Sequence, residues 1–109
     1  MIPTINFEKK IKEIGGKPWS PVDVVKVNDQ ILRMALFKGE FHWHVHDNED
    51  ELFYIVKGEI TIQLEGHPDI IARQGEMAIV PKGIRHCPKS EIDSYVIMFE
   101  PSSLKIQGS

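Results

Sequence analysis

Cysteine is almost absent from this chain: Cys87 is the only one in 109 residues. A single thiol cannot form an internal disulfide, and it cannot supply a cysteine-based zinc site. Scarce cysteine is typical of proteins that work in a reducing compartment, so the sequence predicts a cytoplasmic location.

The chain also lacks a long hydrophobic run and a block of basic residues. Pro3 and Asn6 interrupt the apolar N-terminal residues, which therefore do not follow a signal-peptide pattern. No apolar run approaches the ~20 residues that cross a bilayer. Thirteen Lys and Arg against sixteen Asp and Glu give a net charge of −3 with no basic cluster. We therefore expect no membrane and no nucleic acid among its partners.

What the chain does contain is enough apolar sequence for one packed domain. Hydrophobic residues make up 41% of the chain and charged residues 27%, which argues against disorder. A chain of this length forms a single domain and buries roughly two thirds of its unfolded surface.

One short helix is predicted at residues 6–14. Phe7, Ile11 and Ile14 recur at the spacing of a single helix face, and Gly15 and Gly16 follow as a stop signal.

Beyond the helix, short β-rich runs alternate with turn residues, at a spacing typical of an all-β sandwich or closed barrel. About nine strands are predicted, at residues 22–27, 30–38, 41–46, 51–56, 59–64, 69–72, 77–80, around His86, and 94–99.

The histidines gather in a pattern that suits a metal ion. His42, His44 and His46 alternate with apolar residues, which places them on one face of a predicted strand. Glu51 follows an acidic turn, and His86 lies much later on a strand of its own. Neutral imidazole is a good ligand for zinc, iron, copper or nickel. Three imidazoles and one carboxylate would leave coordination positions open, as in a reactive site.

These residues resemble the first signature motif of the cupin superfamily. That motif reads glycine, a short gap, HxH, three or four residues, glutamate, six residues, glycine. The matching residues here are Gly39, His44, His46, Glu51 and Gly58. The gap after Gly39 has four residues where the family pattern has five, a difference that we assign to a loop.

A second cupin motif follows at the family spacing. It reads glycine, five residues, PxG, two residues, histidine, three residues, asparagine. The matching residues are Gly75, Pro81, Gly83 and His86. Ser90 stands where the motif ends in asparagine, and that asparagine is not a metal ligand in the family.

An alternative register of the first motif pairs His42 and His44 with Glu49. It would put Val56 where the closing glycine belongs, whereas the register beginning at His44 ends on Gly58. We therefore take the later register, and the resemblance implies the metal ligands His44, His46, Glu51 and His86.

The resemblance implies an all-β jelly-roll (double-stranded β-helix) barrel with a short N-terminal helix and a metal inside one end. We expect an N-terminal helical extension at residues 1–18 and a cupin barrel domain at residues 19–109. The cofactor would be one divalent transition metal, namely Fe, Mn, Ni, Co or Zn.

Three functions fit this pattern, because the superfamily hosts many activities. The first is a metal-dependent enzyme acting on a small polar metabolite, of the dioxygenase, isomerase or decarboxylase type. The second is a non-catalytic module that binds or senses a small, sugar-like ligand in the same cavity. The third is a metal-free barrel with a structural role.

Three other residues are candidates for the chemistry. His42 and Tyr95 are candidates for proton transfer. Arg33, His42 and Tyr95 are candidates for substrate binding, and Arg33 interrupts an apolar run. Cys87 is interpreted as a small buried residue rather than a redox-sensitive thiol.

We also expect a homodimer, because a small barrel leaves sheet edges and apolar outer faces exposed. The candidate residues for that surface are Trp19, Val22, Val24 and Phe37.

Overall fold

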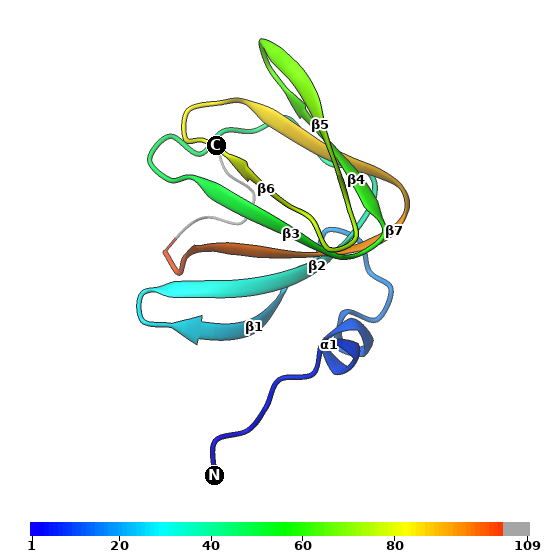
Figure 1. Cartoon of the computed structure of the whole chain (residues 1–109), viewed down its shortest axis with the longest axis vertical. Coiled ribbons are helices and arrows are strands. Elements are labelled where there is room, and N and C mark those ends of the chain that lie inside the picture. The colour runs from blue at the N-terminus through cyan, green and yellow to red at the C-terminus, as the bar shows by residue number, and fades with distance from the viewer. Residues whose placement is uncertain (104–109) are drawn as a thin grey trace.

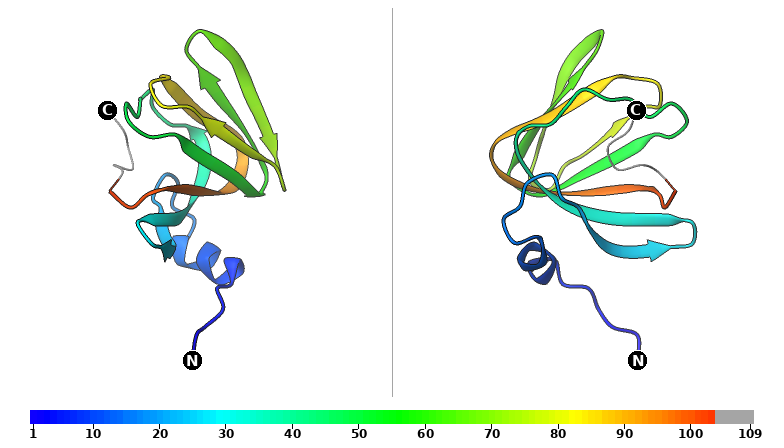
Figure 2. Two further views of the ribbon diagram at one scale, coloured as in Figure 1. Left: turned by 60° about the vertical axis from the view of Figure 1, so that its left-hand side comes forward. Right: turned by 180° about the vertical axis from the view of Figure 1, so that it is seen from behind.

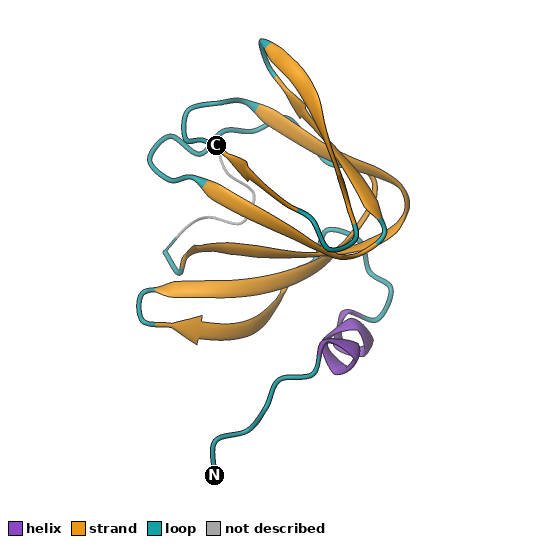
Figure 3. Cartoon of the chain, viewed as in Figure 1, coloured by secondary structure: helices purple, strands orange, loops and turns teal. Residues whose placement is uncertain are grey.

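The chain forms one short helix and seven strands in a computed structural model that describes residues 1–103 (Figures 1 and 3). The elements are α1 Phe7–Ile14, β1 Val22–Val27, β2 Gln30–Glu40, β3 Glu51–Lys57, β4 Glu59–Leu64, β5 His67–Arg73, β6 Met77–Val80 and β7 His86–Pro101. The expected jelly-roll fold with an N-terminal helix is confirmed. Within the described residues, no helix has the length and apolar character needed to cross a bilayer.

Helix α1 begins and ends where its sequence predicts. The side chain of Asn6 accepts a hydrogen bond from the backbone N–H of Lys9 at 3.1 Å, which caps the first turn. Gly15 ends the helix in the left-handed conformation, with φ of 65°. Ile14 is buried against the sheet, so packing supports a helix too short to be stable alone.

The strands form an antiparallel sheet organised around β7. Strand order is β1-β2-β7-β3-β6, and β4 pairs with both β5 and β7. Strand β7 begins beside β4, at His86–Lys89, and continues beside β2 and β3 to its end. The sheet therefore bends until one of its faces is enclosed, although it does not close into a continuous barrel (Figure 2).

Side chains alternate along the strands between two apolar clusters, as the period of two requires. The inner cluster lies inside the bent sheet and contains Ala35, Phe37, Phe53, Ile55, Ile60, Ile62, Ala72, Val80, Val96 and Met98. The outer cluster lies under α1 and contains Ile14, Met34, Leu36 and Ile97.

Two expected strands differ from the structure. Residues 41–46 are not a regular strand, because His44 makes an isolated bridge to His86 and its neighbours form no ladder. The expected short strand at His86 and the last strand at 94–99 are one continuous strand, β7. The isolated bridge places His44 beside His86, which is the first residue of β7.

The residues expected at a dimer surface lie within this chain's own packing. Phe37 is 2% exposed in the inner cluster, so its expected surface position is wrong. Val22 and Val24 pack against the outer cluster, and Trp19 packs against the inner one.

Candidate metal centre

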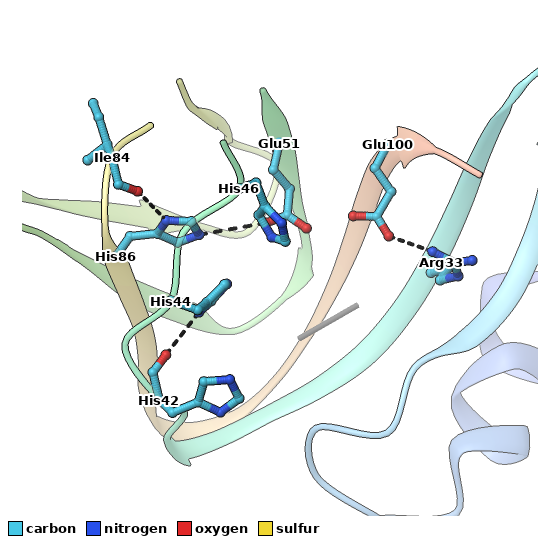
Figure 4. A network of polar contacts seen from close by, with 8 residues as sticks. All are labelled: Arg33, His42, His44, His46, Glu51, Ile84, His86 and Glu100. Atoms are coloured by element: carbon cyan, nitrogen blue, oxygen red, sulfur yellow. Dashed lines mark hydrogen bonds and ion pairs between the residues drawn. The ribbon is translucent and has the colours of Figure 1, made fainter. Parts of the chain in front are cut away.

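Four buried side chains converge at one end of the bent sheet. One ligand atom from each of His44, His46, Glu51 and His86 lies within 4.8 Å of the others (Figure 4). The exposed fraction of each residue is 5% or less. The segment between β2 and β3 supplies two of the histidines, while Glu51 opens β3 and His86 opens β7. The four residues that the motifs singled out are therefore brought together.

Backbone carbonyls fix the orientation of two of the imidazole rings. Nδ1–H of His44 donates to the carbonyl of His42 at 2.9 Å, and Nδ1–H of His86 donates to that of Ile84 at 2.8 Å. A carbonyl oxygen can only accept, so the proton of each neutral ring sits on Nδ1. Both rings then present the lone pair of Nε2 to the cluster, as metal-binding histidines do.

Two ring nitrogens in this cluster face the carboxylate of Glu51 without forming a hydrogen bond. Glu51 Oε1 lies 3.4 Å from Nε2 of His46 and 3.8 Å from Nε2 of His86. Within residues 1–103, neither Nε2 atom has a hydrogen-bond partner. Buried acceptors left this way cost free energy unless a cation lies between them. Metal bonds of about 2.0–2.2 Å would suit this spacing, so the residues fit one transition-metal ion.

Electrostatics keep these groups in the protonation states that bind metals. Burial lowers the pKa of His44 from 6.5 to about 4, so this ring is neutral at neutral pH. Burial raises the pKa of Glu51, but its close contacts with His46 and His86 outweigh that effect and hold the pKa well below its usual range. Glu51 is therefore a carboxylate at neutral pH.

A second buried carboxyl group, that of Glu100 on β7, lies to one side of the cluster and faces Glu51 (Figure 4). Burial and the charge of Glu51 raise the pKa of Glu100 to about 8. Arg33 opposes that shift, because its guanidinium contacts Glu100 Oε1 at 2.7 Å. Arg33 also contacts Asp23 at 3.2 Å. Its guanidinium is therefore paired with two carboxyl groups of the protein itself.

Sequence reasoning missed Glu100, although its position carried a signal. Val96 and Met98 alternate into the inner cluster along β7, and Glu100 continues the same parity. A charged residue at an inward position of a strand is a candidate for a role beside the site.

The remaining sequence candidates lie in different places. His42 is exposed at the edge of the site, with its ring centroid 5.4 Å from that of His44. Tyr95 packs against the outer cluster, so its side chain lies on the opposite face of the sheet from the four ligands. Cys87 is fully buried, and burial raises the pKa of its thiol.

A mostly apolar pocket of about 360 Å³, which includes space open to solvent, adjoins the metal candidate residues. Its lining residues are Trp19, Pro21, Ala35, Phe37, Phe41, His44, Glu51, Phe53, Pro88 and Met98. Sequence reasoning assigned Trp19 and Phe37 to a dimer surface and missed this pocket. Trp19 lies well before the first motif along the chain, so motif spacing could not show its contact with the site.

Comparisons with known proteins agree with this fold and site. A family profile described as the cupin domain matches residues 33–100. A cupin-2 domain containing protein from Shewanella frigidimarina has a solved structure that superimposes with a TM-score of 0.85 at 32% identity. That superposition covers 90% of this chain and 94% of the Shewanella chain.

Two relatives are similar in sequence. The chain is 33% identical over 69 residues to the uncharacterized protein YdbB of Bacillus subtilis, covering 63% of this chain and 61% of that protein. It is 30% identical over 106 residues to 3-hydroxyanthranilate 3,4-dioxygenase of Xenopus laevis, covering 92% of this chain and 37% of the enzyme. The chain therefore spans less than two thirds of the length of each.

Proposed function

The chain belongs to the cupin domain family, and from this premise we propose that it is a metal-dependent enzyme acting on a small molecule, with dioxygenase chemistry. His44, His46, Glu51 and His86 would hold one divalent transition metal. The observation that carries the proposal is the convergence of four buried ligand-type groups within 4.8 Å of one another, in which Nε2 of His46 and Nε2 of His86 have no hydrogen-bond partner among residues 1–103.

The chemistry supported by the site follows from its donor set. A divalent ion supplies Lewis acidity and, if it is redox-active, electron transfer to dioxygen. Three imidazoles and one carboxylate leave coordination positions open on an ion that prefers six ligands. The chain's own part is to hold the donors in place through backbone carbonyls. Its apolar pocket also excludes water from a bound molecule.

Similarity to 3-hydroxyanthranilate 3,4-dioxygenase supports a dioxygenase over an isomerase or a decarboxylase. The pocket next to the site supports it as well, because its apolar lining offers few partners for a sugar-like ligand. Exposed His42 lies close enough to the site to exchange protons with a molecule bound there. Iron is the first ion to test, with manganese, nickel, cobalt and zinc as alternatives.

Metal content tests the proposal directly. Protein purified without added metal is loaded anaerobically with Fe²⁺, desalted and analysed by elemental mass spectrometry. We expect about one ion per chain, and at least a tenfold loss of bound ion in His44→Ala or His86→Ala, because each removes a ligand. His67→Ala is the matched control, since His67 is exposed at the start of β5.

Dioxygen consumption by the iron-loaded protein then tests catalysis, measured with an oxygen electrode against a panel of hydroxylated ring compounds. Uptake that requires both His86 and a panel compound supports the dioxygenase. A wild-type protein that retains no ion after loading contradicts the proposal. Bound ion with ligand-induced thermal stabilisation but no turnover supports a binding module instead.

We also propose a homodimer formed through the outer face of the sheet. Leu32, Leu52, Ile79 and Phe99 are neighbours across four strands, and we call these four residues the outer row. Ile79 is 54% exposed and Phe99 38% exposed, and β6 is an edge strand. A contiguous apolar patch beside an open edge is typical of an interface between subunits.

Two further assignments complete the proposal. Residues 1–18 form an extension on a barrel domain of residues 19–109, of which 104–109 lie outside the described residues. The single cysteine supports work in a reducing cytoplasm, which fractionation of cells that express the tagged chain would test.

A further inference from the structure

An open groove of about 360 Å³ lies on the outer face of the sheet. Leu52, Ile79 and Phe99 of the outer row are among the residues that line it, and its surface is mostly apolar. Ile79 and Phe99 are exposed there, although apolar surface gains free energy when it leaves water. The groove is therefore a candidate docking surface.

One rim of the groove is acidic. Glu49 and Asp50, which immediately precede β3, also line it. A carboxylate oxygen of Asp50 accepts a hydrogen bond from the backbone N–H of Lys82. Neither acid forms an ion pair with any part of the chain that the structure describes. The groove thus combines an apolar floor with a negative rim, which suits a segment whose apolar side chains are followed by basic ones.

The residues before α1 and at its start have that complementary character. Residues 1–5 are extended and point away from the sheet (Figures 1 and 2), and we call this segment the arm. Ile2 is 95% exposed and Ile5 44% exposed, so their own chain covers little of either side chain. Lys9 and Lys12 follow in α1, and both are exposed. Among residues 1–103, neither lysine has an ion-pair partner.

Helix α1 holds the arm beside the surface proposed for the dimer. The helix packs on the outer cluster, against which Leu32 of the outer row also packs. The helix and the outer row therefore share one face of the sheet. Each extended residue spans about 3.3–3.6 Å, so the arm reaches roughly 17 Å beyond the helix. A second copy seated on the outer row lies within that reach.

Resting on the homodimer proposed above, we infer that the arm of one copy docks in the groove of a second copy. Ile2 and Ile5 lie on the apolar floor, and the exposed lysines of α1 approach the acidic rim. Because a two-fold pair repeats each contact, both grooves are filled at once. The docked arm also covers the outer side of β3 beside Glu51, so the second copy braces the strand that carries this metal candidate.

Disulfide trapping between two variants tests the inference directly. Ile5→Cys places a thiol on the arm and Ile79→Cys places one in the groove, while Cys87 is fully buried. When the two variants are mixed and oxidised, a disulfide between positions 5 and 79 can form only between chains. We expect its yield, measured by peptide mass spectrometry, to exceed that of Ile5→Cys with Ile92→Cys at least ~10-fold. Ile92 is the matched control, because it is 55% exposed and lies outside the groove.

Sedimentation of variants that leave the core untouched gives a second measurement. The double variant Ile2→Ser, Ile5→Ser removes the apolar side chains of the arm and should raise the dissociation constant of the dimer at least ~10-fold. Glu49→Lys reverses a charge of the rim and should also weaken the dimer. Glu91→Lys is its control, since Glu91 is exposed and outside the groove.

The outcomes separate the arm from the dimer itself. A dimer that survives the arm and rim variants and gives no excess of the 5–79 disulfide overturns the inference, while the dimer through the outer row stands. If the wild type is a monomer at micromolar concentration, the proposed dimer fails. Trapping at millimolar concentration then decides the arm: an excess of the 5–79 disulfide supports docking, and equal yields overturn it. A disulfide that forms within the double-cysteine chain but not in the mixture overturns the second copy as occupant.

Discussion

At the scale of single residues, each imidazole with a defined hydrogen bond is held by the carbonyl two positions before it. His44 is tied to His42 and His86 to Ile84. The rings are therefore oriented by local backbone, before any ion is bound. Preorganised ligands lose less entropy on binding, so this arrangement favours high metal affinity.

The depressed pKa of His44 predicts a pH dependence of stability in metal-free protein. The folded protein protonates this ring only near pH 4, whereas the unfolded chain does so near its ordinary value of 6.5. Between these values the unfolded state binds more protons at His44. Its contribution to stability is therefore full above pH 6.5 and is lost as the pH falls toward 4.

The measurement is the difference in free energy of unfolding between wild type and His44→Gln, from urea denaturation at several pH values. We expect that difference to rise between pH 4 and 6.5 by up to about 3 kcal/mol. The same experiment with His67→Gln, an exposed ring, serves as the control. A difference that stays flat across the window would falsify the assignment.

The buried pair of Arg33 and Glu100 predicts a second stability effect. Arg33→Leu leaves the Glu100 carboxyl buried without its partner and is expected to cost about 2–4 kcal/mol. Adding Glu100→Leu should recover part of the loss, because both polar groups are then gone. Lys38→Met is the matched control: it breaks the exposed pair with Asp93 and should cost less than about 1 kcal/mol.

Urea denaturation of wild type and of these three variants measures this effect. The pair would lose its structural meaning if Arg33→Leu were as mild as Lys38→Met, or if the double variant were less stable than Arg33→Leu.

At the scale of elements, the turn between β3 and β4 is the most constrained. Gly58 has φ of 96°, and a Cβ added there would approach Ser94 Cβ to 2.7 Å and Ser94 Cα to 2.9 Å. Ser94 cannot yield easily, because its buried hydroxyl accepts from the N–H of Glu59 and lies 2.8 Å from that of Ser90. Ser90, at the position of the motif's asparagine, donates to the Glu59 carbonyl.

Gly58→Ala is therefore expected to destabilise the protein by about 3–5 kcal/mol, from backbone strain and overpacking together. Gly39→Ala is the matched control, because Gly39 also has positive φ but open space around its Cβ position. Only strain of about 1–2 kcal/mol is expected there. Thermal and urea denaturation measure both, and equal losses would show that the contact with Ser94 does not matter.

Element bounds could be predicted where alternation and turn residues agree. The predicted bounds of 22–27, 59–64 and 77–80 are those observed for β1, β4 and β6. The segment 41–46 alternates like a strand, but a strand also needs a neighbour to pair with, and only His44 has one. Local sequence does not show which segments will become neighbours, so alternation alone predicts a strand there.

The continuity of β7 was hidden for a different reason. Its first half contains Pro88, Lys89 and Glu91, which are unusual in strands, and pairing with β4 and β2 holds it extended nevertheless.

At the scale of the whole molecule, the outer row predicts self-association. Sedimentation equilibrium at micromolar concentration should give a dimer, and Ile79→Glu should shift it toward monomer by placing a charge on the apolar face. Ile92→Glu is the control, since Ile92 is 55% exposed and lies outside the outer row. A wild-type monomer under these conditions would contradict the proposal.

The candidate site could be predicted in part, because motif spacing identifies only residues that belong to the motifs. Motif spacing identified His44, His46, Glu51 and His86, which three separate segments bring together. It could not identify Glu100 or Trp19, because both lie outside the motifs. Glu100 reaches the site through the inward parity of β7. Trp19 reaches it from the segment between α1 and β1.

The length of β7 has a consequence for how the molecule comes apart. Strand β7 begins with His86, contains Glu100 as its second-last residue and pairs along its length with β4, β3 and β2. Separating one neighbouring strand would leave the hydrogen bonds between β7 and its other neighbours intact. Separating β7 itself would break its pairing with β2, β3 and β4 together. Slow, concerted amide exchange along β7, on the timescale of global unfolding, is the signature of such all-or-none cooperativity.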